Sequence, residues 1–131
     1  MFAWINLEDF NTAASLTGIG GMHTIKHLTG TDYADRRGMG ITVHQNGKLS
    51  FSWGDGVGHY AYVSQLSESS IQLNTWTHVG FTCSRNGDIS TVTLYINGKA
   101  DKVHTITEPI ANPDDYVHLF SWSRDGNQSY P

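Results

Sequence analysis

Apolar and polar residues alternate along most of this chain, in runs that are too short for helices. In the runs 77–83 and 91–96, alternate positions are apolar: Val79, Phe81, Val92, Leu94 and Ile96. Side chains of a β-strand point alternately to opposite faces, so each run predicts a strand with one face in a hydrophobic core. We expect these apolar residues to point inward.

Asn-Gly pairs follow these runs and predict tight turns. Asn86-Gly87 lies between the two runs, and Asn97-Gly98 precedes a third run at 103–106. Both central residues of a type I′ hairpin turn need positive φ, a conformation that Asn and Gly adopt readily. The sequence therefore predicts a meander of three antiparallel strands.

The same pattern continues outside this meander. Asn46-Gly47 predicts a second hairpin, with strands at 39–44 and 49–53 and with Leu49, Phe51 and Trp53 on one face. Further strands are expected at 2–7, 22–28, 60–66 and 117–122, whereas the glycine-rich stretch 54–58 is expected to be a flexible loop. Short strands joined by turns, without a helical period, predict a β-sandwich or a barrel.

The composition narrows the class of protein. A chain of 131 residues fits one domain. Its net charge of −4, from 8 Lys and Arg against 12 Asp and Glu, argues against nucleic acid as a partner. The sequence has no run of roughly 20 apolar residues that would span a membrane, and its start lacks the pattern of a signal peptide. Cys83 is the single cysteine, so it cannot form an intrachain disulfide, and we expect it in the core.

The stretch Thr75–Lys99 contains a Trp-x-His-Val strand followed by Leu-Tyr-Ile-Asn-Gly-Lys. This combination resembles the laminin G-like domains of the concanavalin A-like lectin/glucanase family. Phe2-Ala3-Trp4-Ile5 and Gly47-Lys48-Leu49-Ser50-Phe51 are similar to an early strand and a middle hairpin of the same family. The resemblance implies an all-β fold, a two-sheet antiparallel jelly-roll sandwich, as a single domain over residues 1–131. It also implies that Trp76 lies in the core and that His78 packs or forms a hydrogen bond.

The resemblance is incomplete at the C-terminal end. Members of the family continue after the region that corresponds to Leu119–Asp125 with a closing strand, which pairs back near the N-terminal strand. This sequence stops at Pro131 without such a strand. Either the chain is a fragment or its sandwich has open edges. An open edge beside Phe2–Leu7 would pair with another chain, so we expect oligomers or a larger assembly.

Two clusters combine an aromatic ring with polar groups, as carbohydrate sites do. The residues concerned are Trp53, Asp55, His59, Tyr60 and Tyr62 in the first cluster, and Trp122 and Arg124, with Asp125 and Asn127, in the second. For Trp53 and Trp122 the alternative is a place in the core, because both alternate with small polar neighbours. We expect these residues to form the rim loops that bind a glycan.

Pairs of aspartates predict a calcium site. Asp32 and Asp35 lie in one loop, and Asp114 and Asp115 in another. Calcium prefers carboxylate and carbonyl oxygens, and the resemblance implies one calcium ion at the rim of the sandwich. The alternative is that these carboxylates are solvated turn residues. A zinc site is not expected, because His23 and His27 would lie roughly 13 Å apart along a strand.

The sequence does not have the pattern of a hydrolase. A retaining glycosidase needs two carboxyl groups about 5–5.5 Å apart, and no predicted strand carries a suitable pair. A Gly-x-Ser-x-Gly elbow is also absent. We therefore expect a non-catalytic recognition module that binds glycans. The alternative is a structural or adhesive protein that contacts other proteins in an extracellular assembly or virus particle. Either function predicts an extracellular location or a virion surface.

Overall fold

The computed structural model describes residues 1–10, 37–44, 46–56, 60–111, 122–124 and 127–129. These residues form strands and turns and contain no helix, so the expected all-β class is confirmed. The described part of the chain also has no helix that is long and apolar enough to cross a membrane.

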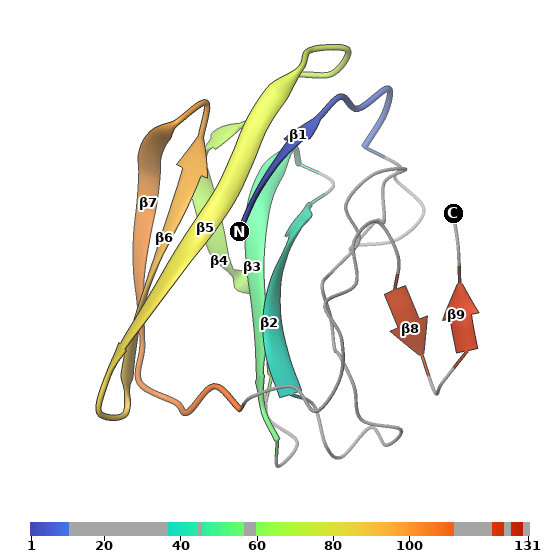
Figure 1. Cartoon of the computed structure of the whole chain (residues 1–131). Coiled ribbons are helices and arrows are strands. Elements are labelled where there is room, and N and C mark those ends of the chain that lie inside the picture. The colour runs from blue at the N-terminus through green and yellow to red at the C-terminus, as the bar shows by residue number, and fades with distance from the viewer. Residues whose placement is uncertain (11–36, 45, 57–59, 112–121, 125–126, 130–131) are drawn as a thin grey trace.

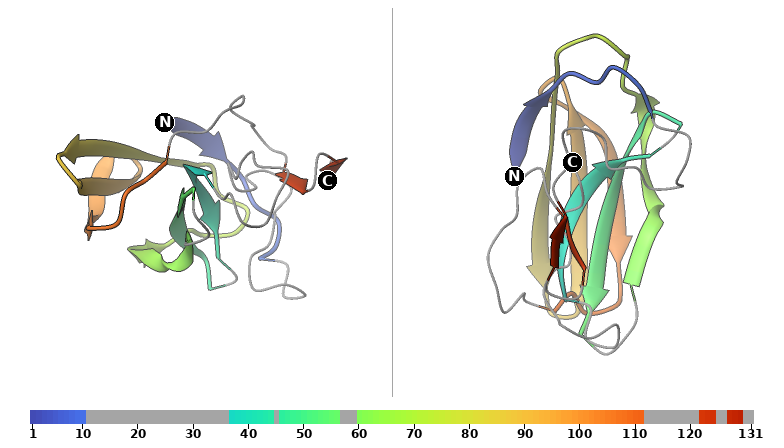
Figure 2. Two further views of the ribbon diagram at one scale, coloured as in Figure 1. Left: turned by 90° about the horizontal axis from the view of Figure 1, so that it is seen from below. Right: turned by 90° about the vertical axis from the view of Figure 1, so that its right-hand side faces the viewer.

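Two antiparallel sheets make up the sandwich. The four-stranded sheet has the order β1-β5-β6-β7, from β1 (Phe2–Ile5), β5 (Thr77–Asn86), β6 (Ile89–Ile96) and β7 (Lys99–Ile106). The three-stranded sheet consists of β2 (Arg37–Val43), β3 (Lys48–Asp55) and β4 (Tyr60–Ser70) in that order. A separate hairpin is formed by β8 (Trp122–Arg124) and β9 (Asn127–Ser129). Figure 1 views the four-stranded sheet from its outer side, and Figure 2 shows the two sheets as layers.

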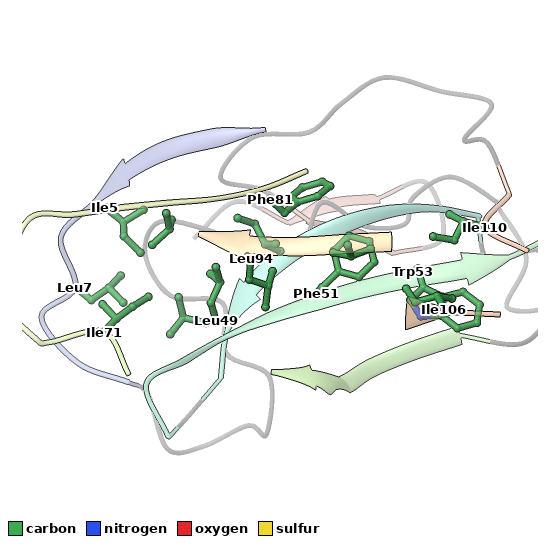
Figure 3. Close-up of a cluster of buried hydrophobic side chains, with 14 residues drawn as sticks. Ile5, Leu7, Leu49, Phe51, Trp53, Ile71, Phe81, Leu94, Ile106 and Ile110 are labelled. Atoms are coloured by element: carbon green, nitrogen blue, oxygen red, sulfur yellow. The ribbon is translucent and has the colours of Figure 1, made fainter. Parts of the chain in front are cut away.

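The core lies between the two layers, where the alternating residues of both sheets meet (Figure 3). Phe51 of β3 and Phe81 of β5 pack edge to face across the layers, with their ring centroids 5.1 Å apart. The expected inward position is confirmed for Val79, Phe81, Val92 and Leu94, which are all buried. Ile96, the last residue of β6, is paired with the inward Val79 but is only half-buried.

The predicted turns form, and one of them is shifted. Asn97 and Gly98 have φ values of 51° and 75°, as a type I′ turn requires. At the β5–β6 hairpin, however, Asn86 is still paired with Ile89, so the turn is Gly87-Asp88 and not Asn86-Gly87. Of these turn residues, only Gly87 has a positive φ, of 61°. Gly87 thus occupies the first turn position, and the hairpin turn lies one residue later than expected.

The glycine-rich stretch after Trp53 begins as strand, which corrects the prediction of a loop from Gly54. Gly54 and Asp55 are the last residues of β3 and pair with Gly38 and Arg37. The carbonyl of Gly54 also accepts a hydrogen bond from the N–H of Ala111, at 2.9 Å. Glycine fits here because neighbouring chain approaches the backbone closely.

Strand β1 forms one edge of the four-stranded sheet. It pairs with β5, and the N–H of Phe81 extends this ladder by donating to the carbonyl of Met1 at 2.8 Å. Within the part of the chain that the structure describes, no strand pairs with the other side of β1. The coverage of this edge by another chain stays a prediction. The strand expected at 22–28, and most of the run at 117–122, lie outside the described residues.

Strands β4 and β7 connect the two sheets along one side of the sandwich. The carboxylate of Asp101 accepts hydrogen bonds from the N–H groups of Glu68, at 2.6 Å, and of Ser69, at 3.2 Å. Lys102 pairs with the Glu68 carboxylate, and the His104 ring contacts the carbonyl of Leu66 at 3.0 Å. Partial burial acts to raise the pKa of Asp101, but the hydrogen bonds from Ser69 and Glu68 and the nearby Lys48 hold it below its usual value.

This contact should make the stability of the sandwich sensitive to acid. A carboxyl whose pKa is lower in the folded state adds stability above the unfolded pKa, about 3.9 for Asp, and that stability is lost as the pH falls through the folded pKa. Asp101→Asn should therefore be less stable than the wild type at neutral pH, and the difference should shrink below about pH 4. Urea unfolding at neutral pH and below about pH 4 measures this difference in stability, and Asp88→Asn, at an exposed position, is the control. An equal difference at both pH values would contradict this account.

Candidate functional site

Aromatic side chains gather on the outer side of the four-stranded sheet, at the β1 edge. Phe2 and Trp4 alternate with the inward Ala3 and Ile5, and Trp76 and His78 flank the buried Thr77. Tyr95 of β6 is paired with Gly80 of β5 and follows the inward Leu94. We call this group the aromatic surface, and its members are Phe2, Trp4, Trp76, His78 and Tyr95.

Four rings of the aromatic surface, those of Phe2, Trp4, His78 and Tyr95, contact one another. The His78 imidazole lies parallel to the Phe2 ring, with centroids 5.5 Å apart and an interplanar angle of 4°. Trp4 is the cross-strand partner of His78, and its ring centroid lies 5.2 Å from that of the imidazole, with an interplanar angle of 50°. Tyr95 lies 5.5 Å from Phe2. These contacts restrict the rings, so the surface is ordered before any ligand arrives.

The two tryptophans of the aromatic surface are unusually exposed for such large side chains. The side chains of Trp4 and Trp76 are 62% and 64% exposed, and Phe2 is 49% exposed. Tryptophan is highly buried on average in folded proteins, so exposed rings that lie together indicate an interaction site.

The backbone beneath the aromatic surface is built to bring the Phe2 ring close to the sheet. Gly80 lies directly under Phe2, and a Cβ atom at this position would lie 2.2 Å from Cδ1 of the ring. The Tyr95 hydroxyl is 3.4 Å from the hydroxyl of Thr82, the next outward residue of β5. The missing side chain of Gly80 therefore gives the Phe2 ring its place.

The position of Trp76 corrects an expectation taken from the family motif. Trp76 was expected in the core, but it precedes the buried Thr77 and points to the outer side. His78 does pack, as expected, between aromatic rings. The alternation of β5 could have shown both positions, because Trp76 and His78 have the opposite parity from the inward Val79 and Phe81.

In the first predicted glycan cluster, the ring that was expected to bind sugar, Trp53, does not lie on the surface. Trp53 is only 8% exposed and belongs to the core, which is the alternative that its small polar neighbours indicated. Its buried indole Nε1 has no hydrogen-bond partner among the described residues. Asp55 is half-buried at the end of β3, opposite Arg37.

The remaining predicted ligand residues are placed only in part. His59 lies outside the described residues. Tyr60 and Tyr62 are in β4, and Trp122 and Arg124 are in β8. Only the backbone of these four residues is described, so their role in binding stays a prediction.

The predicted calcium residues Asp32, Asp35, Asp114 and Asp115 all lie outside the described residues, so this site stays a prediction. Within the described ranges, no group of three or more His, Cys, Asp or Glu side chains could hold a metal ion. Cys83 is half-buried against the core, and its burial raises the pKa of the thiol despite the nearby Ser90 and Arg85. A protonated thiol in this position fits a packing role.

Comparison with known proteins identifies the family. The model of a laminin G-like domain of the concanavalin A-like lectin/glucanase superfamily matches residues 1–131. This chain belongs to that family. No curated protein and no solved structure matches it significantly. Laminin G-like domains are in general lectin-like or adhesive modules, usually non-catalytic and typically extracellular, although the superfamily includes glycosidases.

Proposed function

We propose that this domain is a non-catalytic recognition module that binds carbohydrate through the aromatic surface. The observation that carries the proposal is the exposure of Trp4, which packs against His78, and of Trp76, which precedes His78 by two residues. One side of a pyranose ring presents C–H groups, which stack on the face of an aromatic ring, while its hydroxyl groups remain at the edges for hydrogen bonds. Ordered, exposed tryptophans suit this contact because little side-chain freedom is lost on binding.

The described carboxylates support a binding role rather than hydrolysis. Glu68 is paired with Lys102, and Glu8 and Glu108 are exposed and lie outside the aromatic surface. A glycosidase would need two carboxyl groups flanking a bound sugar, about 5–10 Å apart.

A glycan array with the wild type and two variants tests the proposal. Trp4→Ala and Trp76→Ala should each weaken binding to the recognised glycans by at least about tenfold, since buried aromatic contacts dominate binding energies. Both side chains are largely exposed, so the melting temperature should change little. Asp88→Ala is the control: the Asp88 side chain is 92% exposed and lies in the β5–β6 turn, at the end of the sheet. Unchanged glycan binding by both Trp variants would refute this site.

A second function is favoured by the position of β1. Its outer edge carries no strand within the described residues, and Phe2 and Trp4 project beside that edge. The same surface could join chains in an extracellular or virion assembly by β-strand addition. Light scattering on the same proteins separates the two functions. An array without binding, together with oligomers that the Trp4→Ala variant abolishes, would favour the structural function.

A further inference from the structure

The outer side of the four-stranded sheet extends well beyond the aromatic surface. The residues that face outward by alternation from the core, besides the aromatic surface, are Gly80, Thr82, Ser84 and Asn86 in β5, Ile89, Thr91 and Thr93 in β6, and Ala100, Val103 and Thr105 in β7. Among these described residues, none is Asp, Glu, Lys or Arg. The described part of this face therefore carries no carboxylate, ammonium or guanidinium group.

The charged side chains of the same strands are directed elsewhere. Asp101 and Lys102 of β7 both bind residues of β4, on the side where the two sheets meet. Arg85 and Asp88 lie 3.9 Å apart at the β5–β6 turn, at the end of the sheet. These charged side chains thus lie at an edge and a turn of the sheet, and not among the described outward-facing residues.

Hydroxyl groups form rows across this face. Thr82 is paired with Thr93 between β5 and β6, and Thr91 is paired with Thr105 between β6 and β7. Thr91 and Thr105 are both exposed. The cross-strand row that begins at Phe2 continues through Gly80 and Tyr95 to Ala100. The hydroxyls therefore lie in the next rows along the strands, Thr82–Thr93 and then Ser84–Thr91–Thr105, on the side of the aromatic surface toward the β5–β6 turn. Each hydroxyl can donate one hydrogen bond and accept others, as sugar hydroxyls can.

We propose that the ligand is a neutral, linear oligosaccharide that lies diagonally over the outer face, from the aromatic surface toward Thr91 and Thr105, with its recognition independent of calcium. This inference rests on the proposed function and specifies its ligand class. The aromatic surface stacks one end of the glycan, and the threonine rows bind the hydroxyls of the sugars that follow. Sulfated or uronate glycans need Lys or Arg partners, and calcium-mediated recognition needs carboxylates at the sugar; the described face offers neither. A calcium ion at the predicted rim site would act on stability alone.

Calorimetric titrations with defined oligosaccharides test this ligand class. The probes are the neutral di-, tetra- and hexasaccharides of cellulose, laminarin, mannan and chitin, and the acidic hexasaccharides of heparin and polygalacturonate. We expect affinity for a neutral series that rises with chain length and that EDTA leaves unchanged. It should also change less than about twofold between about 0.1 M and 1 M NaCl, although the Debye length falls from about 10 Å to 3 Å.

Two further variants test the path of the glycan. Thr91→Val and Thr105→Val remove one hydroxyl each and keep a β-branched side chain, so the sheet should remain stable. Each should weaken binding of the hexasaccharide by about threefold to tenfold, the usual effect of a neutral hydrogen bond, and leave the disaccharide unaffected. Equal affinities of the variants and the wild type for the hexasaccharide would overturn the proposed path.

The failures of the two proposals can be told apart. If Trp4→Ala abolishes binding but the bound probes are acidic, or if EDTA abolishes binding, only the neutral and calcium-independent ligand class is wrong. If every probe binds the Trp4→Ala and Trp76→Ala variants as well as the wild type, the carbohydrate function of the aromatic surface is wrong. Binding of a neutral series that both Trp variants lose supports both proposals.

Discussion

Phe81→Ala is expected to lower the free energy of unfolding by about 3–5 kcal/mol, the usual cost of truncating a buried phenylalanine. Phe81 is 6% exposed and packs against Phe51 of the opposite sheet, with ring centroids 5.1 Å apart. Its loss removes the contact that joins the two layers at this point and leaves a cavity between them. Urea unfolding followed by tryptophan fluorescence measures the effect.

Two controls keep this result interpretable. Phe81→Leu retains most of the side-chain volume and should cost clearly less than the alanine variant, so it provides a measurable protein if Phe81→Ala does not fold. Ser84→Ala changes an exposed position of the same strand and should alter stability by less than about 1 kcal/mol. A loss of less than about 1 kcal/mol in Phe81→Ala would contradict the core position of this residue.

The sandwich could be predicted because its strands bury one face each. Val79, Phe81, Val92 and Leu94 alternate with polar residues, and all four point inward as the pattern requires. The Asn97-Gly98 turn could be predicted for a local reason, since both residues adopt the positive φ that a type I′ turn needs. Local pattern and global fold agree at these positions, so the sequence was sufficient.

At the Gly87-Asp88 turn, the local sequence preference does not decide the position of the turn. Asn-Gly at 86–87 has the favoured composition of a type I′ turn, yet Asn86 remains in β5. The register of β5 against β6 is set along the whole ladder by the inward pairs Phe81–Leu94 and Cys83–Val92. Those packed pairs outweigh the local preference of one dipeptide.

The candidate site could not be predicted in the same way, although part of its signal was present. The sequence pattern favours loops as the place of exposed aromatic rings, and it favours Trp53 because a glycine-rich stretch follows it. Burial of Trp53 depends on Ile106 and Ile110, which belong to the same core cluster and come from a distant part of the chain. Trp4 lies in β1 and Trp76 directly precedes β5. In the sequence, only their alternation with the inward Ile5 and Val79 indicates that they face outward.

Gly80→Ala is expected to destabilise the domain by about 1–3 kcal/mol and to release β1 from the sheet. The added Cβ would lie 2.2 Å from Cδ1 of Phe2 and 2.5 Å from the carbonyl oxygen of Met1. The ring could rotate away, but the Met1 carbonyl is fixed by the hydrogen bond from the N–H of Phe81. Strand β1 must therefore shift, and Phe2 and Trp4 shift with it.

Hydrogen exchange separates this mechanism from a general loss of stability. In Gly80→Ala the amide proton of Phe81 should exchange faster, because its acceptor on Met1 is displaced, while amides in β6 stay protected. Gly87→Ala is the matched control. Gly87 has a φ of 61° and no neighbouring atom within 4 Å of an added Cβ, so this variant costs stability only through backbone strain, about 1–3 kcal/mol. It should leave the exchange of Phe81 and the affinity for glycans close to those of the wild type. Wild-type protection of the Phe81 amide in Gly80→Ala would show that β1 does not depend on the close approach of Phe2 to Gly80, and that the aromatic surface tolerates a side chain beneath it.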